Sequence, residues 1–391
     1  MPDWFKYTDQ MGPEKIVYLH DPDTDMKGVM VVDTMNLAGA GGGTRMLPDI
    51  TTEEMVGLAR AMTYKFAMLD LPVGGSKAGI WADPGMPGEK KDAVLKAFGR
   101  LVKPIIESGV TVASDMGTDT EDVETIYAGA GLENRTSGLS LQEKDGEPLE
   151  NHATGYGVVV AARAACEYAG IDIHKATVAI EGFGKAGGGV ARYIEEAGAR
   201  VVAMSNIDGT VYNKGGLDIP SLLAKRDTFG DSALSEYKDA QHLSRKDIFA
   251  LPVDILVPGA RPYVINKKNA ASVQAKVISS IANNPVTDEA DPILFKKGIQ
   301  FMPDFLSNAG GVVIAILDLL SGTADDLFNS LDSLIAPLTK EILSDAEKAK
   351  TPARILAMNR IKEKIMNIRT NKVEPLPFDE VLNLAREKFG L

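Results

Sequence analysis

The first pattern along the chain is an amphipathic helix over residues 51–69. Thr51 and Glu54 form a candidate capping box at its start, and apolar residues then recur at helical spacing, at Met55, Leu58, Met62, Phe66 and Leu69. Lys65 lies three residues after Met62 and four before Leu69, so it shares their inward face. A charged lysine on an apolar face needs a carboxylate partner, and that carboxylate could belong to a substrate.

Short apolar runs that end at glycine or small polar residues predict the strands of an α/β fold. Two of them, residues 29–32 and 110–113, lie in the first part of the chain. Similar runs further along cover residues 176–181, 200–204, 253–258, 275–278 and 298–303. Nearly continuous apolar strands of this kind are typical of a parallel sheet that has helices on both faces.

The chain is long enough for two domains, with 391 residues. Residues 133–150 are polar and contain glycine, which predicts a domain boundary near residue 150. We expect one domain to comprise residues 1–150 plus 324–391, because the long amphipathic helices over 324–371 can pack back on the first part of the chain. Residues 151–323 form the other expected domain.

The composition argues against several classes of function. The net charge of −12 argues against nucleic acid as a partner. The single cysteine, Cys166, allows no intramolecular disulfide and no cysteine zinc site, and the four histidines are far apart, so we expect no metal. The chain starts without a basic and apolar leader and has no run of about 18 apolar residues, so we expect no membrane partner and a cytoplasmic protein.

Two lysines, Lys65 and Lys77, lie twelve residues apart in otherwise apolar surroundings. A lysine among apolar side chains is either held by a carboxylate or loses its proton through desolvation and a nearby like charge. One interpretation is that Lys65 holds an anionic substrate group and Lys77 works as a base. The alternative is that both are surface lysines whose apolar stems cover neighbouring side chains.

The predicted strand 110–113 is followed by Ser114 and then by an aspartate, Asp115. A carboxylate just past a strand end, in a loop that also contains glycine, is a usual place for a catalytic group. The alternative is a cap for the helix that begins near Thr120. Asp119 can take that role, which leaves Asp115 for chemistry.

A glycine-rich turn joins the predicted strand 176–181 to a helix that runs to Ala197. The turn has the pattern GxGxxG, and the strand 200–204 follows the helix. This strand–turn–helix–strand context predicts a Rossmann-type dinucleotide-binding domain. Its glycines let a pyrophosphate approach the helix N-terminus, and the expected contact residues are Gly182, Phe183, Gly184, Lys185, Ala186 and Gly187.

Asparagines at strand ends are further candidates for ligand contacts. Asn206 stands where an acidic residue would bind the adenosine ribose, and Asp208 follows two residues later. Because asparagine can bond to the ribose without repelling a 2′-phosphate, both NAD and NADP remain open. Asn283 and Asn308 follow later strands, whose carboxyl ends line the ligand crevice of such a sheet; the alternative is that both are turn residues.

Taken together, these motifs resemble the glutamate/leucine/phenylalanine/valine dehydrogenase family. The matching segments occur in the family's order between about residues 39 and 365, and are 42–45, 62–65, 74–77, 115–118, 154–157, the glycine-rich turn, 212–218, 282–283 and 308–312. The resemblance implies an N-terminal substrate-binding and oligomerisation domain, a Rossmann-type domain and an active site in the cleft between them. It also implies a homo-oligomer (dimer, hexamer or octamer).

The resemblance carries roles over to individual residues. Lys65 resembles the lysine that binds the substrate α-carboxylate, Lys77 the catalytic lysine and Asp115 the catalytic aspartate. Lys77 in its neutral form would activate the water that attacks the imine, and Asp115 would carry protons to and from the amino group. Closure of the two domains would exclude water. The cofactor contacts implied are Thr154, Asn206, Asn283, Asn308 and the glycine-rich turn.

Departures from the family pattern concern the side chain of the substrate. Glutamate dehydrogenases carry a lysine where this chain has Gly41 and a serine where it has Ala315. Without these partners a second carboxylate would be buried unpaired, which costs about 3–5 kcal/mol. The expected substrate-binding residues, mostly small and apolar, are Lys65, Gly41, Gly42, Ala113, Asn283, Val312 and Ala315.

These residues together predict an NAD(P)-dependent enzyme that deaminates an apolar, branched-chain or aromatic L-amino acid reversibly to the 2-oxo acid and ammonia. Ser280 and Ser76 differ from the residues that relatives often carry, which favours an atypical substrate. One alternative is a glutamate dehydrogenase that uses a different cation. The other is a dinucleotide-binding regulatory subunit without turnover, against which Lys65, Lys77 and Asp115 argue.

Overall fold

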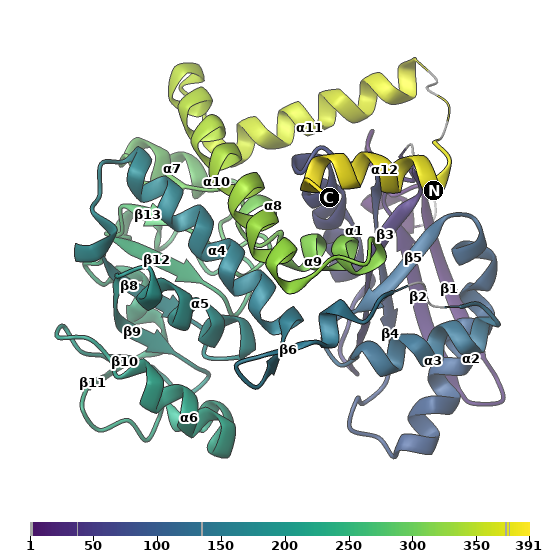
Figure 1. Ribbon diagram of the computed structural model, residues 1–391, viewed down its shortest axis with the longest axis horizontal. Coiled ribbons are helices and arrows are strands. Elements are labelled where there is room, and N and C mark those ends of the chain that lie inside the picture. The colour runs from purple at the N-terminus through teal and green to yellow at the C-terminus, as the bar shows by residue number, and fades with distance from the viewer. Residues whose placement is uncertain (1–2, 37, 134–135, 372–373, 375) are drawn as a thin grey trace. The chain divides into compact units, whose positions relative to one another are not determined.

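The polypeptide folds into two units, each built around its own sheet (Figure 1). The computed structural model describes residues 3–36, 38–133, 136–371, 374 and 376–391. Unit 1 comprises Met1–Ser137, Leu319–Ser321 and Asn359–Leu391, and unit 2 comprises Gly138–Asp318 and Gly322–Met358. The two-domain α/β architecture predicted from the sequence is confirmed.

The sheet of unit 1 has five strands in the order β1-β2-β4-β3-β5. They are β1 (Lys15–Asp21), β2 (Met26–Val32), β3 (Ala40–Met46), β4 (Gly74–Ile80) and β5 (Val110–Ser114). Strand β2 is antiparallel to β1 and β4, whereas β3 is parallel to β4 and β5. Strand β4 is therefore the central strand, and all seven of its residues are buried.

Helices pack against both faces of this sheet. The main ones are α1 (Thr52–Met68), α2 (Gly88–Glu107) and α3 (Thr120–Ala130). Successive residues of β2 point to opposite faces, so Met30 packs in one core cluster with Phe98 of α2, and Val31 packs in another with Met55 of α1. The last helix, α12 (Phe378–Phe389), and the end of α11 (Ala353–Thr370) also belong to unit 1.

The sheet of unit 2 has seven strands in the order β11-β10-β9-β8-β12-β13-β14. They are β8 (Thr177–Glu181), β9 (Arg200–Ser205), β10 (Thr210–Tyr212), β11 (Gln241–Leu243), β12 (Ile255–Pro258), β13 (Val277–Ile278) and β14 (Gln300–Phe301). The run β9-β8-β12-β13-β14 is parallel, and β10 and β11 add antiparallel strands at one edge. The strand order reverses between β8 and β12, which is where ligands bind in doubly wound sheets.

Helices connect and follow the strands of unit 2. They are α4 (Leu149–Tyr168), α5 (Lys185–Glu196), α6 (Ile219–Phe229), α7 (Asp291–Lys296), α8 (Asp304–Ser307), α9 (Gly310–Leu319) and α10 (Ala324–Ala349). A small hairpin of β6 (Glu143–Lys144) and β7 (Glu147–Pro148) precedes α4. None of the helices in the described part of the chain combines the length and apolar character that crossing a bilayer requires.

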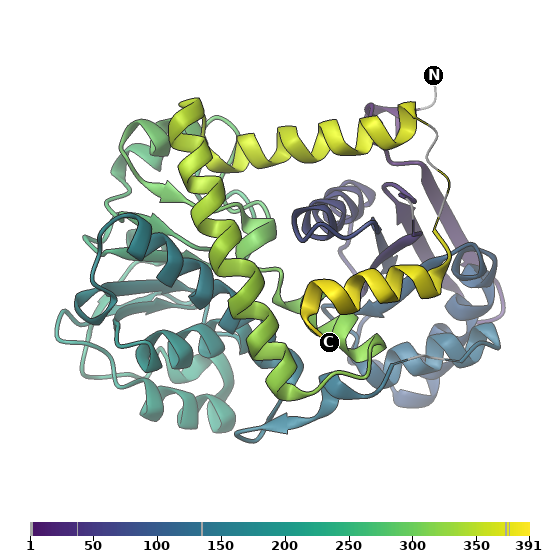
Figure 2. The same cartoon turned by 45° about the horizontal axis from the view of Figure 1, so that its top comes forward.

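The division between the units differs from the expected residue ranges. Unit 2 starts at Gly138 rather than near residue 150, and it includes α10, which we had expected in the first domain. Helix α10 runs alongside α4 (Figure 2). The Tyr156 and Phe328 rings meet edge to face at 4.9 Å, and the Tyr156 hydroxyl donates to Asp332 (2.7 Å). The amphipathic pattern predicts the helix, but its partner depends on contacts about 170 residues apart in sequence.

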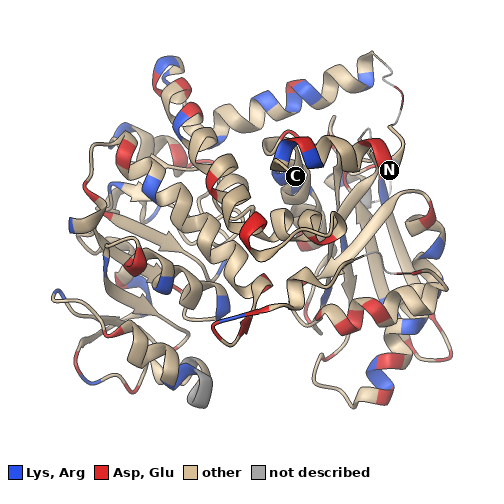
Figure 3. Ribbon diagram, viewed as in Figure 1, with Lys and Arg blue, Asp and Glu red and all other residues tan. Residues whose placement is uncertain are grey.

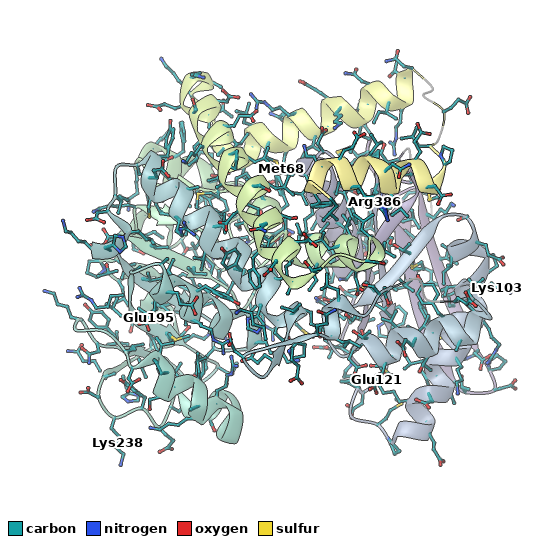
Figure 4. All side chains as sticks on the ribbon, viewed as in Figure 1. Met68, Lys103, Glu121, Glu195, Lys238 and Arg386 are labelled. Atoms are coloured by element: carbon teal, nitrogen blue, oxygen red, sulfur yellow. The ribbon has the colours of Figure 1, made fainter. Side chains whose placement is uncertain are left out.

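Positions of Lys and Arg and positions of Asp and Glu are spread along the ribbons of both units (Figure 3). The exposed side chains of Glu121 on α3 and of Lys238 project from the surface of their respective units (Figure 4).

Candidate active site

Lys77 lies in the middle of β4 and is only 6% exposed. Its Nζ lies 2.8 Å from Oδ2 of Asp115. The ion pair joins β4 to the loop after β5, although β3 lies between these two strands. The structure thus brings together the two residues that the sequence predicts as catalytic.

The loop that carries Asp115 is fixed by hydrogen bonds from Thr118. The Thr118 hydroxyl donates to the Thr44 carbonyl (2.7 Å) and accepts the backbone N–H of Asp115 (3.0 Å). Asp119 caps α3, as predicted, and it also forms a capping box with Asp122. The Asp115 side chain is therefore not used as a helix cap and points to Lys77.

A second cation, Arg45 of β3, also contacts Asp115. Its Nε donates to Asp115 Oδ2 (2.9 Å) and its Nη1 to Glu54 Oε1 (2.5 Å). Burial by itself raises the pKa of Asp115, but the adjacent charges of Lys77 and Arg45 outweigh burial and hold that pKa below its usual range. Asp115 is therefore a carboxylate at neutral pH.

The approach of these side chains requires a glycine at position 43. A Cβ on Gly43 would lie 2.8 Å from the Asp115 Cβ and 3.1 Å from the Lys77 Nζ. A Cβ on the neighbouring Gly42 would lie 1.7 Å from the Ser76 carbonyl oxygen. The glycines of β3 thus make room for the lysine and for the strand that carries it.

Lys65 lies near the end of α1 and is half-buried. Its neighbours in sequence, Tyr64 and Phe66, are buried, as is Leu69 one turn later. Thr51 caps the helix by accepting the N–H of Glu54, but the Glu54 carboxylate bonds to Arg45 instead of completing the predicted capping box.

The remaining substrate candidates of unit 1 lie on paired strands. Gly41 pairs with Thr111, Gly42 with Val112, and Gly43 with Ala113 in the parallel register of β3 and β5. Ala113 is half-buried. A Cβ on Gly41 would lie 2.9 Å from Thr111 Oγ1 and 3.2 Å from the Phe66 ring. A phenyl ring and a hydroxyl therefore occupy the space beside Gly41.

The glycine-rich turn of unit 2 lies between β8 and α5, as the fingerprint predicts. Gly182 has a φ of 106°, which favours glycine, and a Cβ on Gly187 would lie 2.1 Å from the Gly182 carbonyl oxygen. Gly184 is the N-cap of α5, where no side chain caps the helix and a Cβ would meet nothing within 4 Å. This open helix N-terminus fits a dinucleotide pyrophosphate.

The other residues of the turn divide into buried and exposed positions. Phe183 is 1% exposed and belongs to the core, so its side chain is not available to a ligand at the turn. Lys185 is exposed, and Ala186 is half-buried. The sequence predicts all three residues as cofactor contacts, whereas in the structure the side chain of Lys185 is the exposed one.

At the end of β9, the Asn206 side chain organises a turn. Its Oδ1 accepts the N–H groups of Asp208 (2.9 Å) and Gly209 (3.1 Å), and its Nδ2 donates to Ser235 (3.2 Å). Asn206 is buried, and Asp208 is exposed. The exposed carboxylate at this strand end is therefore that of Asp208.

Asn283 and Asn308 are in direct contact. The Asn308 Nδ2 donates to the Asn283 Oδ1 (3.0 Å) and to the Ile281 carbonyl (3.0 Å). The turn that carries Asn283 also contains Ser280, whose carbonyl accepts the hydroxyl of Ser307 (3.0 Å). The structure therefore joins two strand-end loops that sequence analysis could only name separately.

Thr154 lies on α4 where this helix meets the start of α9. A Cβ on Gly311 would lie 3.6 Å from the Thr154 Oγ1. Gly311 and Ala315 are exposed one helical turn apart, whereas Val312 is 3% exposed and packs inward. Among the predicted lining residues of α9, Ala315 is therefore accessible and Val312 belongs to the core.

Comparison with known proteins identifies the family. The pattern of the family described as Glutamate/Leucine/Phenylalanine/Valine dehydrogenase matches residues 146–369, and that of the Glu/Leu/Phe/Val dehydrogenase, dimerisation domain, matches residues 13–130. The chain belongs to this family. It is accordingly an amino acid dehydrogenase, as the motifs of the sequence implied.

Individual relatives agree with this assignment. A glutamate dehydrogenase of Thermotoga maritima is 34% identical over 341 residues, which cover 82% of this chain and 81% of the relative. The hetero-hexameric glutamate dehydrogenase of Thermus thermophilus, solved in a Leu-bound form, is similar with a TM-score of 0.79 at 26% identity, covering 91% and 90% of the two chains. L-tryptophan dehydrogenase from Nostoc punctiforme shares the fold, with a TM-score of 0.67 at 24% identity and coverage of 94% and 99%.

Sequence reasoning missed Arg45 in this dehydrogenase. Arg45 stands at the end of the quoted segment 42–45, so the motif contained the signal, but its contact with Asp115 spans 70 residues. Among the described residues, no group of three or more His, Cys, Asp or Glu side chains could hold a metal ion.

Proposed function

We propose that this dehydrogenase catalyses the reversible NAD(P)-dependent oxidative deamination of an apolar L-amino acid, with a branched-chain or aromatic side chain. In the deamination direction the amino acid, the oxidised dinucleotide and water give the 2-oxo acid, ammonia, the reduced dinucleotide and a proton. The amino acid loses a hydride from Cα and a proton from nitrogen, and water supplies the oxygen of the new carbonyl group.

The observation that carries the apolar specificity is the packing around Gly41. Glutamate dehydrogenases have a lysine at this position, whereas here the Phe66 ring and the Thr111 hydroxyl occupy the adjoining space. Neither group carries a positive charge that could form an ion pair with a side-chain carboxylate. A carboxylate bound there without a cation would lose about 3–5 kcal/mol relative to a paired one.

The residues of unit 1 divide the work on the amino acid. Lys65 binds the α-carboxylate. Lys77 activates the water that attacks the imine carbon, and Asp115 exchanges a proton with the amino group. Because the Lys77 Nζ lies 2.8 Å from Asp115, a proton can pass between them without rearrangement. Arg45 holds Asp115 in place and keeps it ionised.

The residues of unit 2 that would hold the dinucleotide are those of the turn Gly182–Gly187, with the ribose near Asn206 and Asp208. A bound dinucleotide supplies the hydride acceptor. The chain itself contributes the uncapped N-terminus of α5 for the pyrophosphate and the Asn283–Asn308 pair at the carboxyl end of the sheet.

NAD is the proposed dinucleotide, because the exposed carboxylate of Asp208 would repel a 2′-phosphate. Replacing Asp208 with serine is expected to improve kcat/KM for NADP relative to NAD by about tenfold or more. Steady-state kinetics with both dinucleotides measure this ratio. Asp239 lies outside this strand end, and Asp239→Ser is the control that should leave the ratio unchanged; an unchanged ratio in Asp208→Ser would contradict the assignment.

Glutamate is the second candidate substrate, because relatives such as the Thermotoga maritima protein are glutamate dehydrogenases. A panel of leucine, valine, phenylalanine, tryptophan and glutamate, each crossed with NAD and NADP, separates the candidates. We expect turnover of at least one apolar amino acid with higher kcat/KM than glutamate. Turnover of glutamate alone would overturn the proposal, and dinucleotide binding without turnover of any amino acid would favour a regulatory subunit.

We further propose that the chain forms a homo-oligomer, because residues 13–130 match a dimerisation domain. Light scattering coupled to size-exclusion chromatography measures the subunit number. A mass equal to one 41.8-kDa chain at assay concentration would contradict this proposal.

A further inference from the structure

A buried carboxylate, Asp33, lies directly after β2 and is 0% exposed. Arg60 of α1 donates its Nε to both oxygens, at 2.8 and 2.9 Å. The hydroxyl of Thr63, one turn further along α1, donates to Oδ2 at 2.6 Å. A buried carboxylate is stable only when it is paired and hydrogen-bonded, and these contacts supply both conditions.

The same cluster reaches the start of β4 at Gly75. The backbone N–H of Gly75 donates to the Thr63 hydroxyl (3.1 Å), and its carbonyl accepts the N–H of Asp33 (2.8 Å). A Cβ on Gly75 would lie 2.1 Å from the Ala59 carbonyl oxygen and 2.3 Å from the Thr63 nitrogen. The backbones of α1 and β4 are therefore in contact at this point, and Asp33 bonds to side chains of α1 and to the backbone of β4.

The position of this contact relates it to the proposed site. Thr63 comes two residues before Lys65 on α1, and Gly75 comes two residues before Lys77 on β4. Each lysine thus lies a short, regular piece of backbone away from one fixed contact. A shift of α1 along β4 would change the distance between the carboxylate-binding lysine and the catalytic lysine.

We propose that Asp33 and Thr63 are positioning residues that set the separation of Lys65 and Lys77. This inference rests on the proposed roles of the two lysines. Asp33 and Thr63 do not touch the reacting atoms; they act through the backbones of α1 and β4. A misplacement of about 1 Å between groups that hold and attack a substrate can lower the rate by about 10²-fold.

The charge balance of the cluster supports a fixed geometry. Burial raises the pKa of Asp33, against the opposing effects of Arg60 and the Thr63 hydroxyl. Arg60 also makes two bonds to Asp9, at 2.9 Å each. Because the guanidinium is held from both sides, Asp33 cannot move without breaking several charge-assisted bonds.

The test compares isosteric and conservative replacements of Thr63. Thr63→Val removes the hydroxyl that joins Asp33 to Gly75 and keeps the shape, whereas Thr63→Ser keeps the hydroxyl. We expect Thr63→Val to lower kcat by about 10- to 100-fold and to raise KM for the amino acid, with KM for the dinucleotide unchanged. Thr63→Ser, which keeps the hydroxyl, should have a kcat within about threefold of the wild-type value.

A matched control is Thr339→Val on α10. Like Thr63, Thr339 is buried on a helix, and its hydroxyl has no hydrogen-bond partner in the described part of the chain. Thr339→Val should leave kcat and the KM values for the amino acid and the dinucleotide unchanged. Asp33→Asn provides a second variant of the cluster, with the same expected loss of kcat, if Thr63→Val does not yield folded protein.

The outcomes separate this inference from the proposed function. If Lys65→Ala and Lys77→Ala lose activity while Thr63→Val and Asp33→Asn keep the wild-type kcat, only the positioning role is overturned. If both lysine variants keep activity, the proposed roles of the lysines fail. If Thr63→Val and Thr63→Ser lose kcat equally, or if Thr63→Val lowers only the melting temperature, the cluster is structural and the inference is wrong.

Discussion

Replacing Lys77 with alanine is expected to abolish oxidative deamination, with a decrease in kcat of about 10³-fold or more. The variant loses the only group in our scheme that activates the attacking water. In this variant Asp115 stays ionised beside Arg45, and it no longer has a lysine with which to exchange a proton. Steady-state kinetics with the best amino acid of the panel measure this loss.

Dinucleotide binding should survive in the Lys77 variant, because the glycine-rich turn belongs to unit 2. A fluorescence titration with the reduced dinucleotide checks this point. Lys91→Ala is the matched control: Lys91 forms an ion pair with Asp122 at 2.7 Å in the same unit, away from β4. If Lys77→Ala kept activity within about tenfold of Lys91→Ala, Lys77 would not be the base.

Local sequence patterns were sufficient for several elements that carry the site, but not for β3 (Ala40–Met46), whose glycine-rich sequence predicts a loop. The helical spacing of Met55, Met62 and Leu69 predicts a helix over residues 51–69, and each end of the observed helix, Thr52–Met68, lies within one residue of that prediction. Asp119 caps α3 as expected, because a cap is determined by residues three positions apart. The glycine-rich turn was predicted for the same reason, since strand, turn and helix are contiguous in the chain.

Contacts between distant segments could not be predicted in this way. The bond between Arg45 and Asp115 spans 70 residues, and the packing of Phe66 beside Gly41 depends on how α1 lies on the sheet. The inward orientation of Val312 likewise depends on the core that α9 meets. Hydrophobic periodicity gives the buried face of an element but not the partner of that face.

A buried acidic group in unit 2 gives the largest expected effect on stability. Asp291, in the first turn of α7, is 3% exposed, and its Oδ2 has no hydrogen-bond partner within the described residues. Burial raises its pKa to about 7; Arg354 opposes this shift, and the nearby carboxylates of Asp288 and Asp304 add to it. The carboxyl group is therefore protonated in the folded protein at mildly acidic pH.

A carboxyl group whose pKa is raised on folding destabilises the folded protein as the pH rises. Between the ordinary value of 3.8 and about 7, the folded state keeps a proton that the unfolded state has released. The free energy of unfolding therefore falls with increasing pH across this window and levels off above it. Asparagine cannot ionise, so Asp291→Asn removes this pH dependence while keeping the shape.

We expect the stability advantage of Asp291→Asn over the wild type to grow by about 2–3 kcal/mol between about pH 5 and pH 8.5. Melting temperatures of both proteins across this range measure it. Asp325→Asn is the control, because Asp325 is exposed in the first turn of α10 and is not among the groups that shift the pKa of Asp291, so its replacement gives no growing advantage. A difference between Asp291→Asn and the wild type that stayed constant with pH would show that Asp291 is ionised throughout, because only a proton held by the folded state makes the advantage depend on pH.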